Sequence, residues 1–154
     1  MSELLQAVYQ GNQARVDELL AASPDLDVFE ASAVGRTDRL RELLDGDPSL
    51  ANAWADDGFQ PLGLACFFGH VDAARLLVER GAEVNSASRN DLKVMPLHSA
   101  AATGNPEVRY ELAKLLLEHG ADANARQQDD FTPLIAADHH GDERLRTLLV
   151  EHGA

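Results

Sequence analysis

Residues 115–124 read LLLEHGADAN, and two other stretches repeat this phrase: LLVERGAEVN at 76–85 and LLVEHGA at 148–154. A Pro-Leu pair precedes each copy, and the three prolines are Pro61, Pro96 and Pro133. These prolines lie 35 and 37 residues apart. A unit of this length, with two short helical patterns and a turn, is typical of a stacked repeat protein. The repetition therefore predicts an architecture built from neighbouring units.

Each complete unit carries start and stop signals for two helices. In one unit, Pro61 stands where a helix begins, because proline at the first helical position loses no useful N–H. The predicted helix continues from Leu62 to Phe68 and ends at Gly69, since glycine tolerates the left-handed conformation found at helix ends. A second helix is predicted from Val71 to Arg80. Neither helix can bury its apolar side alone, so neighbouring units must stack.

These residues resemble the ankyrin repeat. Its pattern contains Thr-Pro-Leu-His, Ala-Ala, Gly-His, a Leu-Leu pair and Gly-Ala-Asp followed by Asn. The chain departs from that pattern where Met95 or Gln60 replaces the threonine, and where Ile135 or Gly63 replaces the histidine. The resemblance covers nearly the whole chain, with fidelity that falls toward the N-terminus. It implies an all-α solenoid of stacked helix-turn-helix units with projecting β-hairpin-like loops.

We expect a single ankyrin-repeat domain spanning residues 1–154. Its five units would be 1–24, 25–54, 55–88, 89–126 and 127–154.

The first and last units are expected to act as caps. Gly11 and Gly35 lie only 24 residues apart, which is too close for a full projecting hairpin, so the first unit should be a bare helix pair. Ser2 is a suitable N-cap for its first helix. In the last unit, three interior-type positions become polar, as expected where no further unit stacks; they are Asp138, Glu143 and Arg146.

The fourth unit is longer than its neighbours. Four extra residues fall within 105–111, which amounts to about one helical turn. Two more residues are inserted before Pro96. Insertions in repeats often mark the binding side. Harmless drift in a tolerant loop is the alternative, and the sequence leaves both interpretations open.

Composition narrows the class of partner and the compartment. The 154 residues include 45% hydrophobic and 5% aromatic residues, and the net charge is −13. Such acidity argues against a nucleic-acid backbone or an anionic membrane as partner. Cys66 is the only cysteine, so an intramolecular disulfide is impossible. With no secretory pattern and no long apolar run, the sequence predicts a soluble, cytoplasmic protein.

The sequence offers little for catalysis, cofactors or metals. His139 and His140 are adjacent, so on a helix they point about 100° apart and do not form a chelating pair. Cys66 occupies a position where a small buried residue is expected. Several aspartates fall in turns, where such residues bond to their own backbone. No zinc spacing, phosphate-binding glycine loop or serine elbow is present, so we expect no enzyme activity, no cofactor and no metal.

The family resemblance implies that the hairpin tips and first helices form a concave recognition surface. Mapped onto this chain, the candidate partner-binding residues are Trp54, Asp56, Phe59, Phe67, Arg89, Lys93, Arg126, Gln128, Phe131 and His139. Aromatic anchors accompanied by arginines are favoured at protein-binding surfaces. The alternative is that Phe59 and Phe131 merely cover neighbouring hairpins, and that Phe67 completes the core of its helix pair.

The predicted function is a non-catalytic protein–protein interaction module, acting as scaffold, adaptor or inhibitor for an unidentified protein partner. A monomer is expected. The alternatives are a self-associating structural protein and a regulatory accessory subunit of an enzyme.

Overall fold

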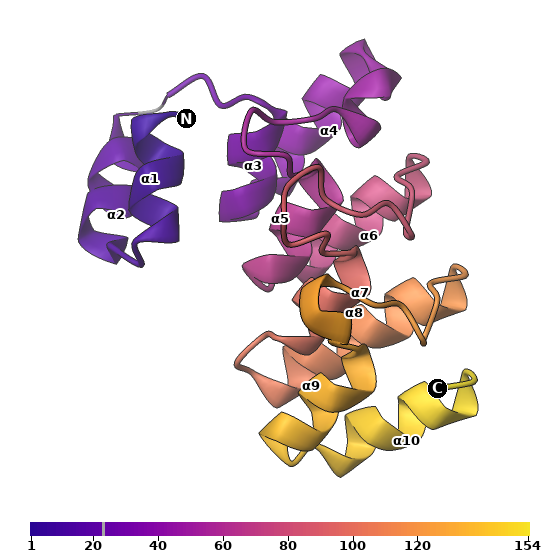
Figure 1. Ribbon diagram of the computed structural model, residues 1–154. Helices are drawn as coiled ribbons and strands as arrows, with labels where there is room; N and C mark the ends of the chain where they lie inside the picture. Colours follow the sequence, from indigo (N-terminus) through magenta and orange to yellow (C-terminus); the bar gives the residue numbers. More distant parts are fainter. Residues whose placement is uncertain (23) are drawn as a thin grey trace.

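The fold is a succession of antiparallel helix pairs (Figure 1). The computed structural model describes residues 1–22 and 24–154. The α-helices are α1 (Glu3–Tyr9), α2 (Gln13–Ala21), α3 (Val28–Val34), α4 (Thr37–Gly46), α5 (Pro61–Phe67), α6 (Val71–Glu79), α7 (Pro96–Ala101), α8 (Pro106–Glu118), α9 (Pro133–His140) and α10 (Glu143–Glu151). Two short 3-10 helices, η1 (Pro48–Asn52) and η2 (Gln128–Asp130), lie in the connections. No β-strand occurs within the two described ranges. The predicted all-α fold is therefore confirmed.

Four of the pairs stack in a column. The first helices α3, α5, α7 and α9 pack in order, and the second helices α4, α6, α8 and α10 form a parallel row beside them (Figure 1). The core is built almost entirely from leucine and alanine, including Leu40, Leu77, Leu116 and Leu149. Small residues let thin helices approach closely, and each unit buries its apolar side against the next.

Local signals set the helix ends. The helix predicted behind Pro61 is α5, and the helix predicted from Val71 ends at Glu79, one residue early. Gly69 has a φ of +79°, in the left-handed region that favours glycine. The Ser2 side chain accepts a hydrogen bond from the Leu5 N–H, so the predicted N-cap of α1 is confirmed.

Asparagine side chains link successive units. Asn85 donates from Nδ2 to the Gly120 carbonyl at 2.9 Å, and its Oδ1 accepts from the Asp122 N–H at 2.8 Å. Asn52 makes the equivalent bonds one unit earlier, to the Gly81 carbonyl and from the Glu83 N–H. These bonds satisfy backbone groups near helix ends that would otherwise depend on water.

The connections before α5, α7 and α9 are hairpin-like loops. The Ser88 N–H donates to the Val94 carbonyl across one loop, and the Arg89 N–H donates to the Gly58 carbonyl of the loop before it. Gly58 has a φ of +89°, and a Cβ there would lie 2.5 Å from the Arg89 oxygen. The close approach of adjacent loops therefore requires glycine at this position.

The N-terminal helix pair does not continue the column. Helix α1 packs on α3, but α2 lies away from α4, so the pair stands to one side of the stack (Figure 1). Tyr9 of α1 reaches past the second unit to Phe68 and Asp57 of the third. Helices α1 and α2 thus form a pair that lies beside the column.

Candidate functional site

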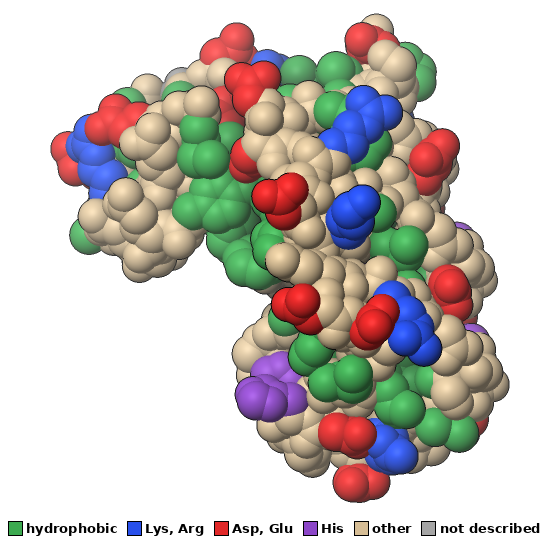
Figure 2. Space-filling model, viewed as in Figure 1, with side chains coloured by type: hydrophobic (Ala, Val, Ile, Leu, Met, Phe, Trp, Pro, Cys, Tyr) green, Lys and Arg blue, Asp and Glu red, His purple; other side chains and the backbone are tan. Residues whose placement is uncertain are grey.

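The candidate site is the surface formed by the hairpin-like loops and the exposed side of the first helices, here called the recognition face. It comprises the loops at 53–60, 86–95 and 125–132, together with α3, α5, α7 and α9. Charged side chains of both signs and hydrophobic side chains alternate across the molecule in Figure 2. The sequence-predicted residues all lie on these elements.

Two of the predicted residues are brought together from consecutive loops. The Arg89 guanidinium lies over the Trp54 ring, 3.9 Å from its centroid. Trp54 is half-buried and Arg89 is exposed. A cation held over an aromatic ring near solvent contributes about 0.5–1 kcal/mol. The stack fixes a flat aromatic surface beside a positive charge.

The loop at 125–132 carries three of the predicted residues, and it is bonded to the loop that contains Lys93. The Gln128 N–H donates to the Leu92 carbonyl at 3.0 Å, which joins this loop to the one that contains Lys93. Arg126 lies 3.6 Å from the Asp130 carboxylate, and both side chains are mostly exposed. Such a pair contributes little to stability, so Arg126 can exchange this partner for another at small cost. Lys93 is also exposed.

Phe59 and Phe131 pack inward in part. Phe59 belongs to an apolar cluster around Leu64, and Phe131 packs against the main core. Both rings are half-buried, as the packing alternative expects, and part of each remains at the surface. Asp56, at the tip of the same loop as Phe59, is exposed.

Phe67 and His139 occupy matching positions near the ends of α5 and α9, and both face solvent. Phe67 is 54% exposed and packs edge-on against Phe68, with ring centroids 4.9 Å apart. His139 packs edge-on against His140 at 6.2 Å. Figure 2 shows histidine side chains on the surface near α9. His139 lies far along the column from Trp54, so the predicted residues form a strip rather than one compact patch.

Sequence reasoning missed a contact between the first and third units. The Tyr9 hydroxyl donates to Asp57 Oδ2 at 3.0 Å, and the Tyr9 ring meets Phe68 edge-on with centroids 5.5 Å apart. Burial, and then the Asp57 carboxylate, raise the pKa of Tyr9, so the phenol stays protonated and keeps donating. Tyr9 aligns with Phe67 in the repeat, but nothing in the spacing indicates a partner 48 residues away.

Two exposed apolar side chains on the recognition face were also missed. Leu92 at a loop tip is 47% exposed, and Ile135 on α9 is 45% exposed. Ile135 stands where the repeat pattern has histidine, and this departure was a usable signal. Because residues are inserted in the loop that contains Leu92, the repeat pattern did not predict the position of this side chain.

The chemical groups at hand do not favour catalysis. Burial raises the pKa of the Cys66 thiol to about 12, so this thiol is not a nucleophile near neutral pH. Within residues 1–22 and 24–154, no three histidine, cysteine or carboxylate side chains are grouped so as to hold a metal ion. None of the described helices has the length and apolarity that a membrane crossing requires.

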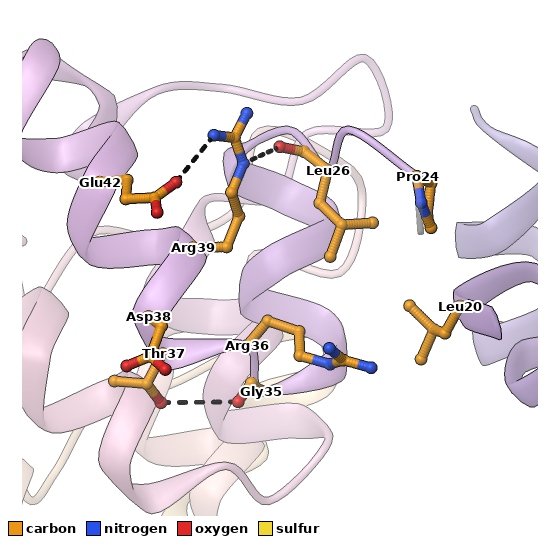
Figure 3. Close-up of a pocket in the computed structure, with 9 residues that line it drawn as sticks. All are labelled: Leu20, Pro24, Leu26, Gly35, Arg36, Thr37, Asp38, Arg39 and Glu42. Atoms are coloured by element: carbon orange, nitrogen blue, oxygen red, sulfur yellow. Dashed lines mark hydrogen bonds and ion pairs between the residues drawn. The ribbon is translucent and has the colours of Figure 1, made fainter. Parts of the chain in front are cut away.

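One cavity lies away from the recognition loops, between α2 and the turn that joins α3 to α4. Its volume is about 580 Å³. Figure 3 shows Leu20 on one side and Arg36, Arg39 and Glu42 on the other. Arg39 is already engaged, since it donates to Glu42 and to the Leu26 carbonyl. The cavity is therefore an open crevice between helix pairs, and the polar groups that line it do not converge on a single point.

Comparison with known proteins agrees with the geometry. A family model described as ankyrin repeats (3 copies) matches residues 4–88 and 86–154.

Three curated relatives illustrate the range of the match. The chain is 37% identical over 59 residues to the Mus musculus ankyrin repeat and SAM domain-containing protein 6, covering 38% of this chain and 7% of that protein. It is 31% identical over 90 residues to the Homo sapiens DNA-binding protein RFXANK, covering 58% of this chain and 34% of that protein. It is 30% identical over 128 residues to Gallus gallus inversin, covering 83% of this chain and 11% of that protein. The matched part spans about a third or less of each relative's length.

Proposed function

Because this chain belongs to the ankyrin repeat family, we propose that it is a non-catalytic module that binds a protein partner on its recognition face. Ankyrin repeats generally serve as protein-interaction modules. For this chain we assign binding to the recognition face and contact to the predicted residues on it. We also keep the cytoplasm as the expected compartment.

The observation that carries this proposal is a set of exposed apolar side chains on the loops and first helices. Phe67, Leu92 and Ile135 are each about half exposed, and Trp54 in the loop before α5 is half-buried. Large apolar side chains that remain exposed on loops and first helices are available for contact with another protein. Large apolar anchors surrounded by polar groups dominate binding energy at protein interfaces.

Charge narrows the partner further. The chain carries a net charge of −13, whereas Arg89, Lys93 and Arg126 place positive charge at the loop tips. We infer a partner with a mixed surface, basic around its rim and with acidic groups opposite these three side chains. Complementary charges of this kind chiefly raise the association rate and select the orientation.

One relative is named a DNA-binding protein, but the charge of this chain does not suit DNA as a partner. Affinity for DNA depends on neutralising phosphates with lysine and arginine, and this chain has 13 bases against 26 acids. A protein partner is the better fit to such a surface.

The test is affinity capture with matched variants, followed by mass spectrometry and binding measurements on the purified partner. The face variant is Phe67→Ala combined with Leu92→Ala. The control is Val150→Ala, because Val150 is similarly exposed but lies on α10, away from the loops. The expected result is capture by wild type and by the control, with binding weakened about tenfold or more in the face variant.

Equal capture by all three proteins would move the contact surface to another side of the molecule and contradict the proposal. Self-association is the second possibility, and the same samples decide it by sedimentation at several concentrations. A dimer that the face variant disrupts would make the partner a second copy of this chain.

A further inference from the structure

The recognition face is already occupied at its N-terminal end. Ala33 on α3 holds the position that Phe67 holds on α5, Ala102 just after α7 and His139 on α9. The last three side chains are exposed, whereas Ala33 is only 1% exposed. Ala33 is covered because α1 lies on α3 at the side of the column, where the other units leave the surface open.

Helix α1 covers this region with three residues at helical spacing. Leu5 is buried in a cluster with Ala33 and Leu64, and Val8 packs beside it. Tyr9 adds the edge-on contact with Phe68 and the hydrogen bond to Asp57 described above. Residues i, i+3 and i+4 lie on one side of a helix. An amphipathic helix that lays such a stripe into an apolar groove is a recurring mode of protein recognition.

The surface beneath α1 has the chemistry of a groove for a helix. Its floor contains Ala33 and Leu64, and its walls are the half-buried rings of Phe29, Phe59 and Phe68. Asp57 stands at the edge as a hydrogen-bond acceptor. We call these six residues the N-terminal groove. Figure 2 shows hydrophobic side chains gathered where the N-terminal helix pair meets the column, above a hollow in the outline.

The α1–α2 pair is incompletely seated on the rest of the molecule. Two crevices of about 340 and 580 Å³ lie between the pair and the column, and Leu20 of α2 lines both. Figure 3 shows Leu20 across the gap from the α3–α4 turn. Elsewhere in the column, second helices pack on second helices. Side chains that face an open crevice lack part of the dispersion contacts that hold a buried helix in place.

The segment that follows the α1–α2 pair is bonded to the column. Arg39 of α4 donates to the Asp25 carboxylate at 2.6 Å and to the Leu26 carbonyl at 3.0 Å. Asp27 then forms a capping box with Glu30 at the start of α3. The chain from Asp25 onward is therefore fixed to the column.

We propose that the N-terminal groove is a helix-binding site, that α1 is its resident occupant, and that a partner helix of like chemistry displaces the α1–α2 pair. The partner helix presents apolar side chains at i, i+3 and i+4, the last of them with a hydroxyl for Asp57. This inference rests on the proposed function and names the class of partner element for one end of the recognition face. Such displacement draws on regions that open locally at lower free energy than the whole fold.

The test uses the full chain and a helical peptide probe. The probe is a fluorescent peptide of residues 1–12, with a lactam bridge that joins Gln6→Lys to Gln10→Glu. Both side chains are exposed, so the bridge stabilises the helix and leaves its packing side unchanged. The opened chain carries Leu5→Asp with Tyr9→Ala, and its circular dichroism must match that of wild type apart from the loss of α1.

Saturable binding to the opened chain, about tenfold or more tighter than to wild type, is the expected result. Adding Phe68→Ala to the opened chain should abolish it, whereas adding Val150→Ala on α10 should leave it unchanged. Equal binding by wild type and opened chain, or no binding by either, would overturn the proposal. Neither outcome depends on the unidentified partner, so the result is separable from that of the capture experiment.

Hydrogen exchange on wild type provides an independent check that needs no variant. The amides of α1 and α2 should exchange about tenfold or more faster, relative to their intrinsic rates, than those of α5 and α8. Exchange of α1 at the global unfolding rate would show that the pair does not open separately, and this would also overturn the proposal.

Discussion

The Arg109 guanidinium and the Asp142 carboxylate form a buried ion pair between the fourth and fifth units. Nη1 lies 2.7 Å from Oδ2, and the two side chains are only 4% and 10% exposed. Arg109 also donates to the Thr103 carbonyl, and Asp142 caps α10 by accepting from the Leu145 N–H. Arg109 lies in the segment 105–111, which contains the four extra residues. The insertion lengthens α8 to 13 residues, against nine in α6 and α10, and its buried arginine fastens one unit to the next.

Replacing Arg109 by methionine should destabilise the protein strongly, because Asp142 would be left buried without its charge partner. Removing one member of a buried pair costs about 3–5 kcal/mol. The measurement is the free energy of unfolding from urea titration. Arg144→Met is the control, since Arg144 is an exposed neighbour that pairs with Glu107. That loss should be below about 1 kcal/mol. Equal losses in the two variants would contradict the assignment.

The same pair predicts a loss of stability in acid. Burial alone would raise the pKa of Asp142, but hydrogen bonds from the Leu145 N–H and Arg109 outweigh it, and the pKa falls below its ordinary value of 3.8. A depressed carboxyl pKa stabilises the fold above the unfolded-state value, and this contribution is lost as pH falls through the folded-state pKa. Unfolding free energies between about pH 5 and pH 2.5 should therefore decline, and Asp142→Asn should reduce the slope. An unchanged slope would show that other carboxylates are responsible.

A second pH effect is expected near pH 6 from His98. Its Nδ1 accepts from the Met95 N–H at 3.1 Å, so Nε2 carries the proton and donates to the Ala125 carbonyl at 2.9 Å. Burial lowers the pKa of His98 from its ordinary 6.5, and the bond to Ala125 offsets this in part. The unfolded chain then binds the proton more readily, so stability is full above about pH 6.5 and declines as pH falls toward the folded-state pKa.

The check is the free energy of unfolding at about pH 7.5 and pH 5.5, with His98→Gln expected to reduce the difference. A rise in stability on acidification across this interval would show that the sign is wrong. NMR titration of the His98 ring measures the pKa directly.

Much of the fold follows from local signals that the sequence displays openly. Three signals define the helix bounds of units such as α5–α6 to within about one residue: proline at the start of the first helix, glycine after it, and a Leu-Leu pair in the second helix. These signals depend on backbone chemistry at the residue itself. They therefore survive the imperfect match of each copy to the family pattern.

The remaining features depend on contacts between distant segments. The position of α1–α2 depends on Tyr9 meeting Asp57 and Phe68, and the role of the insertion depends on Arg109 meeting Asp142, 33 residues later. An arginine in an inserted turn reads as a solvated residue until its partner is known. The candidate site was predicted as a set of positions, but which side chains pack inward was decided by the neighbouring loops.

Leu116 provides the measure of how strongly neighbouring units stabilise each other. Leu116 lies on α8, and its side chain is fully buried in the core of the stack. Leu116→Ala should lower the free energy of unfolding by about 2–5 kcal/mol, through lost burial and the cavity left behind. The exposed Val150→Ala is the control, with an expected change within about 0.5 kcal/mol. A small loss at Leu116 would mean that the stack closes around the cavity.

Trp54→Ala separates a binding role from a packing role. Trp54 is half-buried beneath Arg89, so its removal exposes little core and costs the cation–ring contact, about 0.5–1 kcal/mol. Its main effect should be on partner affinity, because a tryptophan anchor at an interface commonly contributes about 2 kcal/mol or more. Calorimetry with the captured partner and urea titration of the variant measure the two effects. Arg89→Ala should reproduce the stability change without adding to it in the double variant, since the same contact is lost. A Trp54→Ala protein that unfolds would instead place the ring in the core, and the recognition face would lose its central anchor.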